Sequence, residues 1–256
     1  MSNPLISIII TYYKKKKYIQ KTIESIKRQS HKNFQLIFVY DDTDQKDLSY
    51  IKKIIRKIKI KKLIINKKNL GVAVSRNIAS KYIRGKFTAF IDADDIWKKN
   101  KLSLQIEFMI KYNLNFSHTN YFVIDKKEKK IGKFKAKPEI EYQDLLKSCD
   151  IGLSTVIVKR NLLKKNLFCK LQTKEDFYLW LQIIKNEKKI FSVNKYLSYW
   201  RYLENSLSSS IIQRLLDAFR LYYIYEKNNF FTSVYYVLRL SYYAFIKKIN
   251  IYKTYG

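Results

Sequence analysis

The chain has 256 residues, of which 47% are hydrophobic and 16% aromatic, so it can build a substantial core, and general disorder is excluded. Lysine and arginine number 52 against 21 for aspartate and glutamate, which gives a formal net charge of +31. Such a charge attracts nucleic acid, an anionic membrane or a phosphorylated substrate. Because basic residues occur throughout the chain, a compositional bias spread over solvated faces explains the charge equally well.

Cysteine usage and the start of the chain indicate a cellular location. Cys149 and Cys169 form neither a close metal-ligand pair nor a disulfide framework, so a reducing cytoplasm is expected. The first residues lead directly into a strand-like run, without the basic and apolar segments of an export signal. No uncharged apolar stretch is long enough to cross a bilayer.

The first hundred residues alternate short apolar runs with helical patterns, which is typical of βα units and a mainly parallel sheet. Strands are predicted at 5–10, 35–40, 63–65 and 87–91. Apolar residues at helical spacing lie between and after them: Ile19, Ile23 and Ile26; Leu48, Ile51, Ile55 and Ile58; Val74, Ile78 and Tyr82; and Leu102, Ile106 and Met109. The fold class is therefore α/β, with helices on both faces of the sheet.

The pattern changes after residue 110. Short strands are predicted at 116–119, 121–124 and 154–158, with a charged turn near 126–130, so the sheet is expected to become mixed. A helix is predicted over 176–185, and two helices rich in tyrosine, phenylalanine and basic residues follow from about residue 209.

Acidic residues follow two of the predicted strands. Asp41 and Asp42 end the strand at 35–40, and Asp92, Asp94 and Asp95 end the strand at 87–91. Ligands of open α/β sheets bind beyond the carboxyl ends of the strands. Carboxylates spaced like Asp92 and Asp94 can hold Mg²⁺ or Mn²⁺ against phosphate oxygens, although acidic turns without a metal are also common. An EF-hand is excluded because its glycine and glutamate are absent.

Several segments together resemble one enzyme family. They are 7–13 (SIIITYY), 22–30 (TIESIKRQS), 34–42 (FQLIFVYDD), 69–77 (NLGVAVSRN), 85–97 (GKFTAFIDADDIW), 175–180 (EDFYLW) and 199–201 (YWR) with Asn205 and Ser206. Their order and spacing resemble the inverting family 2 glycosyltransferases, which have a GT-A-type nucleotide-binding fold. The resemblance covers residues 5–208. It implies a nucleotide-binding half at 1–110 and an acceptor-binding half at 111–208. The composition of the remaining residues, 209–256, predicts a basic aromatic helical tail.

The resemblance also implies roles for particular residues on the donor side. Thr11, Tyr13 and Asp42 would surround the nucleobase, with Asp42 accepting a hydrogen bond from a ring N–H. Asp92 would approach the ribose or the metal, and Asp94 would be the principal ligand of Mg²⁺ or Mn²⁺.

Further residues would act on phosphate and on the acceptor. Arg76 suits phosphate oxygens because its donors form a planar fork, although a surface helix arginine is an equally good interpretation. Asp176, next to Glu175, would be the general base, and burial or the neighbouring carboxylate would raise its proton affinity. Arg201 and His118 are candidates for contacts with phosphate or acceptor.

The family pattern is not matched everywhere. Thr11 stands in place of the usual proline, Lys14 in place of a frequent asparagine, and Thr43 in place of the glycine that commonly follows the acidic pair. The base-binding turn is therefore expected to be less flexible than in most members. The lysine run at 14–17 is interpreted as a solvated loop.

The expected partners are a nucleotide-diphosphate sugar and a glycan or lipid-linked acceptor, with a role in bacterial envelope polysaccharide or lipopolysaccharide synthesis. The tail has two interpretations, a helical pair packed on the domain or a pair of helices lying on the inner face of an anionic membrane. A sugar-phosphate nucleotidylyltransferase is disfavoured because the turn after the first strand has no glycine-rich phosphate loop. A nucleic-acid-binding protein is disfavoured because the strand ends are acidic.

Overall fold

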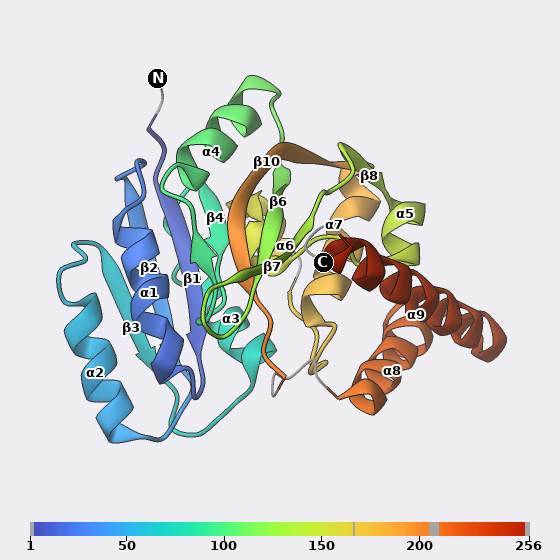
Figure 1. Cartoon of the computed structure of the whole chain (residues 1–256), viewed down its shortest axis with the longest axis horizontal. Coiled ribbons are helices and arrows are strands. Elements are labelled where there is room, and N and C mark those ends of the chain that lie inside the picture. The colour runs from blue at the N-terminus through green and yellow to red at the C-terminus, as the bar shows by residue number, and fades with distance from the viewer. Residues whose placement is uncertain (1–2, 166, 205–209, 254–256) are drawn as a thin grey trace.

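The computed structural model describes residues 3–165, 167–204 and 210–253, and its centre is a ten-stranded sheet (Figure 1). The strand order is β3-β2-β1-β4-β9-β6-β10-β5, with β7 paired to β6 and β8 paired to β10. The strands are β1 (Ile6–Tyr12), β2 (Phe34–Tyr40), β3 (Lys61–Ile65), β4 (Phe87–Phe90), β5 (Ile96–Trp97), β6 (Phe116–Ile124), β7 (Lys130–Phe134), β8 (Glu139–Glu141), β9 (Ile157–Lys159) and β10 (Lys189–Arg201).

The predicted change from a parallel to a mixed sheet is confirmed. β1 pairs in parallel with β2 and β4, and β2 pairs in parallel with β3. β9 is antiparallel to both β4 and β6, and it joins the parallel half to the second half. Since β1, β2 and β4 run in the same direction, the acidic residues that follow β2 and β4 come to one edge of the sheet.

Helices cover both faces of the sheet, as expected for strands that are apolar on both sides. They are α1 (Lys16–Lys27), α2 (Gln45–Ile55), α3 (Val72–Ser80), α4 (Lys101–Lys111), α5 (Tyr142–Lys147), α6 (Arg160–Lys165), α7 (Glu175–Glu187), α8 (Ile211–Arg220) and α9 (Phe230–Tyr252). Successive residues of β1 point to opposite faces. Ile8 packs in the core under α1, α2 and α4, whereas Ile9 packs in the larger core with α3 and α7.

Two predicted elements differ in the structure. The separate strands expected at 116–119 and 121–124 are one strand, β6, because the polar Asn120 at the expected break is buried and hydrogen bonded. The strand expected at 154–158 begins instead with a 3-10 turn, Leu153–Thr155, and only β9 is extended. The short elements β8, α5 and α6 had no sequence signal.

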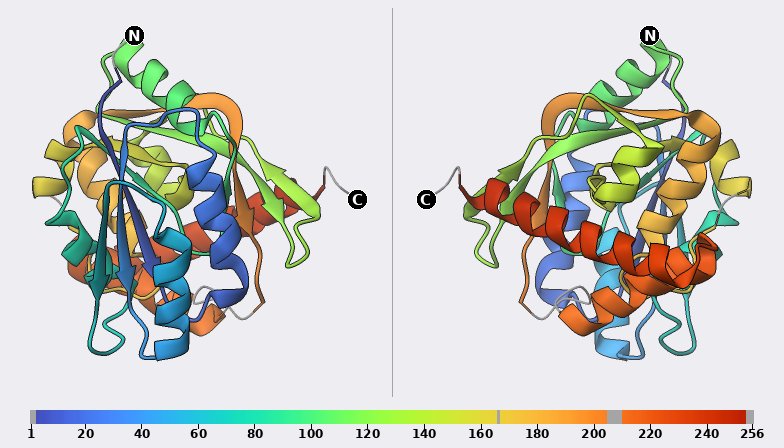
Figure 2. Two further views of the ribbon diagram at one scale, coloured as in Figure 1. Left: turned by 90° about the vertical axis from the view of Figure 1, so that its left-hand side faces the viewer. Right: turned by 90° about the vertical axis from the view of Figure 1, so that its right-hand side faces the viewer.

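The tail packs along one side of the molecule (Figure 2). A π-helical turn, Leu221–Tyr225, follows α8, and Tyr222 and Leu240 are buried in the main core. The far end of α9 reaches β7, where a β-carbon added to Gly132 would lie only 2.6 Å from the Ile251 side chain. No helix among the described residues combines the length and apolarity needed to cross a bilayer. The predicted boundary at 208–209, with Asn205 and Ser206, lies outside the described residues.

Candidate active site

The ends of β1 and β2 are tied together by Asp42. Its carboxylate accepts hydrogen bonds from the backbone N–H of Lys14 (3.0 Å) and of Thr43 (2.8 Å). Lys14 has a φ of 50°, a left-handed conformation that a lysine adopts only at a cost, and the hydrogen bond that its backbone N–H donates to Asp42 offsets that cost. A carboxylate has about four acceptor positions, so Asp42 can still accept the predicted bond from a nucleobase. Tyr13 is exposed and Thr11 is half-buried beside it.

Asp41 shapes the loop that leads into α3, a role that the sequence did not reveal. Its carboxylate accepts from the Asn66 side chain (2.7 Å) and from the backbone N–H of Leu70 (2.8 Å) and Gly71 (3.0 Å). Gly71 then begins α3 with φ 85° and ψ 159°, a region open essentially to glycine alone. The motif contains Asp41, but nothing in it distinguishes this structural carboxylate from Asp42.

Arg76 on α3 links the two groups of predicted catalytic carboxylates. Its guanidinium lies 2.8 Å from Asp92 at the end of β4 and 2.5 Å from Glu175 at the start of α7. The Arg76 side chain is only 5% exposed, and the surrounding carboxylates raise its pKa against the opposing effect of burial. The structure therefore excludes a surface position for Arg76. Its contact with donor phosphate stays a prediction.

Asp94 is paired with a lysine. The Lys15 ammonium lies 2.7 Å from Asp94, and the neighbouring Lys16 lies 2.8 Å from Asp47. The interpretation of residues 14–17 as solvated is therefore wrong for Lys15, whose side chain is 26% exposed, but not for Lys16, whose side chain is 54% exposed. Folding brings the turn after β1 against the turn after β4, and a local charge pattern contains no information about that contact.

Asp95 and Arg201 hold the acidic turn in place. The Asp95 carboxylate is buried and accepts the backbone N–H of Arg201 (2.9 Å), and burial followed by repulsion from Asp94 raises the pKa of Asp95 well above its usual range. The fully buried Arg201 side chain donates to the carbonyl of Asp94 (2.9 Å), to the carbonyl of Asp125 (3.0 Å) and to Glu128 (3.2 Å).

Arg201 is therefore a brace of the acidic turn, which differs from the predicted contact with phosphate or acceptor. Its guanidinium is taken up by partners within the protein, and its side chain has no exposed surface to offer a ligand.

Glu175 and Asp176 begin α7, where the helix dipole favours negative charge. Burial, reinforced by the charge of Asp176, raises the pKa of Glu175 to about 7. Burial also raises the pKa of Asp176 above its ordinary value, as the predicted general base requires. The charge of Asp176 acts in turn on Asp92, whose pKa is raised by burial and by neighbouring carboxylates. The predicted donor-side carboxylates and the predicted base thus share one edge of the sheet.

His118 lies on β6 and is fully buried. Neither of its ring nitrogens has a hydrogen-bond partner within the described part of the chain, and burial lowers the pKa of the ring to about 3. The imidazole is therefore neutral and has no surface exposed to an acceptor. The buried position of His118 therefore differs from the predicted contact with the acceptor, as that of Arg201 does.

The residues that could hold a metal are Asp92 and Asp94. No group of three metal-ligating side chains occurs among the residues with described positions. Both carboxylates nevertheless attract cations, Arg76 and Lys15 respectively. Mg²⁺ is usually bound through one or two carboxylates plus substrate phosphates and water, so this pair fits such an ion once Lys15 moves aside.

Comparisons with known proteins agree with this geometry. The model of the family described as glycosyl transferase family 2 matches residues 7–171. An Escherichia coli relative, UDP-Glc:alpha-D-GlcNAc-diphosphoundecaprenol beta-1,3-glucosyltransferase WfgD, is 38% identical over 216 residues, which cover 84% of each chain.

Two solved structures share the fold. Staphylococcus aureus TarS 1–349 in complex with UDP-GlcNAc has a TM-score of 0.68 at 23% identity, covering 83% of this chain and 65% of that one. The mannosyltransferase PcManGT from Pyrobaculum calidifontis, in complex with GDP-Man and Mn²⁺, has a TM-score of 0.70 at 12% identity, covering 93% and 70%. The expected GT-A-type α/β fold is confirmed, and the chain belongs to glycosyl transferase family 2.

Proposed function

We propose that the chain moves a sugar from a nucleotide-diphosphate donor to a hydroxyl of a lipid-linked acceptor, with inversion at the anomeric carbon. The observation that carries this proposal is the Arg76 bridge between Asp92 and Glu175, which fixes the donor-side carboxylates beside the start of α7. Both WfgD and the TarS complex have UDP in their names, which favours a UDP-sugar as the donor.

In the proposed reaction, Asp176 accepts the proton of the acceptor hydroxyl while that oxygen attacks the anomeric carbon. A new carbon–oxygen bond forms on the face opposite the nucleotide as the bond to the diphosphate breaks. The raised pKa of Asp176 gives its carboxylate more affinity for that proton than an exposed aspartate has. Arg76 keeps Glu175 and Asp92 in place, and Asp42 and Tyr13 would hold the base.

Mg²⁺ or Mn²⁺ would be held by Asp94 and Asp92, and it would neutralise charge on the departing diphosphate. The PcManGT complex, which shares the fold, contains Mn²⁺, and this favours a divalent ion as the cofactor. Lys15 has to leave Asp94 when the ion binds, and the donor phosphates would offer its ammonium a new partner.

The test compares Asp176→Asn with Glu187→Gln, a control at the other end of α7. We expect Asp176→Asn to lower kcat by about 10²- to 10⁴-fold, the usual contribution of a general base, with donor affinity unchanged. Transfer of radiolabelled sugar to a lipid-linked acceptor measures turnover, and calorimetry measures donor binding. Near-normal turnover in Asp176→Asn would contradict the assignment of the base.

The donor and the metal are tested by thermal shift. UDP-, GDP- and dTDP-sugars are screened with Mn²⁺, and the correct nucleotide should raise the unfolding midpoint because it binds only the folded state. Asp94→Ala should remove the part of this shift that depends on Mn²⁺. A shift of equal size with EDTA in place of Mn²⁺ would show that donor binding does not need a metal ion.

We also propose that the outer face of α9 lies on an anionic membrane. Six large apolar side chains, spaced alternately four and three residues apart, are between 44% and 83% exposed on this helix: Phe231, Tyr235, Leu238, Tyr242, Phe245 and Ile249. In the described part of the tail, 210–253, the carboxylates are Asp217 and Glu226, and both side chains are buried. The exposed charges beside the apolar stripe are therefore basic, which complements anionic lipid.

A further inference from the structure

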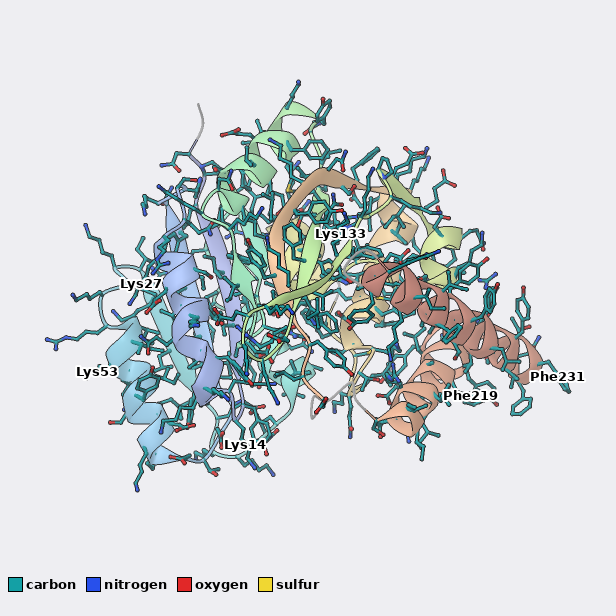
Figure 3. The ribbon with its side chains drawn as sticks, viewed as in Figure 1. Lys14, Lys27, Lys53, Lys133, Phe219 and Phe231 are labelled. Carbon is teal, nitrogen blue, oxygen red and sulfur yellow. The ribbon has the colours of Figure 1, made fainter. Side chains whose placement is uncertain are left out.

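A cavity of about 640 Å³ lies between α9 and the second half of the sheet. One wall comes from the end of β7 and from β10, and the opposite wall comes from the last turns of α9. Lys133 marks its position in Figure 3, beside the end of α9 and far from Phe231. The functions assigned above use none of its lining residues.

The cavity has an excess of positive charge. Lys133, Lys135 and Lys247 line it together with one carboxylate, Asp150. Asp150 is already engaged, because it lies 3.3 Å from the Lys247 ammonium and accepts a hydrogen bond from Ser148 (2.6 Å). Lys133 and Lys135 form no ion pair with any described residue. Two lysines without an ion-pair partner among the described residues therefore line this space, which suits a ligand with two or more negative charges.

The rest of the lining is aromatic and aliphatic. Phe134, Tyr243 and Ile246 contribute apolar surface, and the Lys247 ammonium lies 4.3 Å from the centre of the Phe134 ring. Tyr243 is also 38% exposed, and as the residue after Tyr242 it is turned about 100° around the helix, to the edge of α9 between the apolar stripe and the cavity. A chain that lies along the outer face of α9 can thus continue into the cavity around Tyr243.

The cavity borders the segment that leads to the acidic edge. Lys247 donates to the carbonyl of Cys149 (2.8 Å), and Ser154, five residues further on, accepts the backbone N–H of Asp92 (3.0 Å). Burial, followed by the negative charge of Asp176, raises the pKa of the Cys149 thiol to about 12. Cys149 therefore lies near both the cavity and Asp176.

We propose that this cavity binds the diphosphate and the first isoprene units of a polyprenyl-diphosphate-linked acceptor, with Lys133 and Lys135 contacting the phosphates. The inference rests on the proposed function, since it names the acceptor class of that same site. A sugar attached to the diphosphate would extend past Cys149 toward Asp176, and the lipid would leave past Tyr243 to the membrane.

The test uses geranyl diphosphate, a short soluble prenyl diphosphate, in the absence of vesicles, so that general attraction to a membrane surface cannot contribute. The full chain is compared with Lys133→Ala/Lys135→Ala and with Lys52→Ala/Lys53→Ala on α2. The control loses the same charge from exposed positions at the opposite end of the molecule (Figure 3).

We expect calorimetry to show about tenfold or weaker binding in the Lys133→Ala/Lys135→Ala variant and unchanged binding in the control, where tenfold corresponds to about 1.4 kcal/mol. Equal affinity in both variants would overturn the proposal. Inorganic pyrophosphate should bind more weakly than geranyl diphosphate. Equal binding would show that the cavity does not bind the isoprenoid part. Saturating UDP with Mn²⁺ should not displace geranyl diphosphate; displacement would place the ligand in the donor site instead.

Lys247→Met supplies a second variant, and circular dichroism establishes whether it folds. If it folds, its affinity for geranyl diphosphate should also fall. Asp176→Asn should bind geranyl diphosphate as well as the unchanged chain does. Normal turnover in Asp176→Asn would therefore contradict the assignment of the general base without affecting the binding result. The proposed reaction and the proposed prenyl diphosphate site can thus be refuted independently.

Discussion

At the scale of single residues, the acidic edge depends on one buried arginine. Arg76 contacts Asp92 and Glu175 from a helix that belongs to neither of their segments. Without a cation between them these carboxylates would repel each other in a poorly solvated site, and part of the charge would be lost by protonation. Because the pKa of Glu175 is about 7, this carboxyl is only partly ionised near neutral pH even with Arg76 beside it.

Arg76→Met should therefore destabilise the protein in a pH-dependent way. Glu175 has a pKa of about 7 in the native state, against 4.5 ordinarily, so its contribution to stability is fully present below pH 4.5 and falls as the pH rises toward 7. Near pH 5 Glu175 is protonated and uncharged, so removing Arg76 should cost little unfolding free energy at this pH. At pH 8 the unpaired charge should cost about 3 kcal/mol of unfolding free energy.

Urea unfolding at pH 5 and pH 8 measures this difference. Arg84→Met, at an exposed arginine just after α3, serves as the control and should change stability by only a few tenths of a kcal/mol at both pH values. The same loss for Arg76→Met at both pH values would show that Glu175 is not the group that responds.

At the scale of secondary-structure elements, the sequence predicted the strands and helices of the first hundred residues because their apolar periodicity is strong. It failed where distant partners determine the conformation. Asn120 looks like a strand break, but its side chain accepts from Ala136 (2.9 Å) and donates to Asn194 (3.2 Å). Ser154 looks like a strand residue, but its carbonyl accepts from Trp97 and Ser198, and these bonds stabilise a 3-10 turn.

The site followed the same rule. Motif residues such as Asp42 and Glu175 were predicted from the sequence because they match the pattern of the family. Partners supplied by other elements were not, because pairs such as Lys15 with Asp94 are separated by 79 residues and form only when the turns after β1 and β4 meet.

The start of α3 offers a prediction at this scale. Gly71→Ala should cost about 1–3 kcal/mol through backbone strain alone, because a β-carbon there would meet no atom within 4 Å. Gly152→Ala is the matched control: Gly152 has φ −78°, and the nearest atoms to an added β-carbon lie 3.7 Å away. Thermal unfolding should show a clear loss for Gly71→Ala and almost none for Gly152→Ala. Equal effects would refute the strain argument.

At the scale of the whole molecule, the tail separates two surfaces of different chemistry. The helix α9 runs along one side of the molecule (Figure 2). One side of α9 packs against β7 and lines the lysine-rich cavity, and the other side carries the apolar stripe. The alternating spacing of the stripe is also that of a helical dimer seam. Charge favours a membrane over a second copy of the chain. A second copy would bring its exposed cations against those of the first, whereas anionic lipid would neutralise them.

Flotation with anionic vesicles tests the membrane assignment. Phe231→Ser/Leu238→Ser/Phe245→Ser removes three residues of the stripe and should reduce the vesicle-bound fraction about tenfold or more, because each side chain contributes roughly 1.5–3 kcal/mol when it leaves water. Ile60→Ser/Ile65→Ser/Ile110→Ser removes three apolar residues elsewhere, each 42–48% exposed, and should bind vesicles normally. High salt should weaken binding of the unchanged chain by screening its cations. A lipid-independent dimer in sedimentation that the first variant abolishes would instead assign the stripe to a second copy.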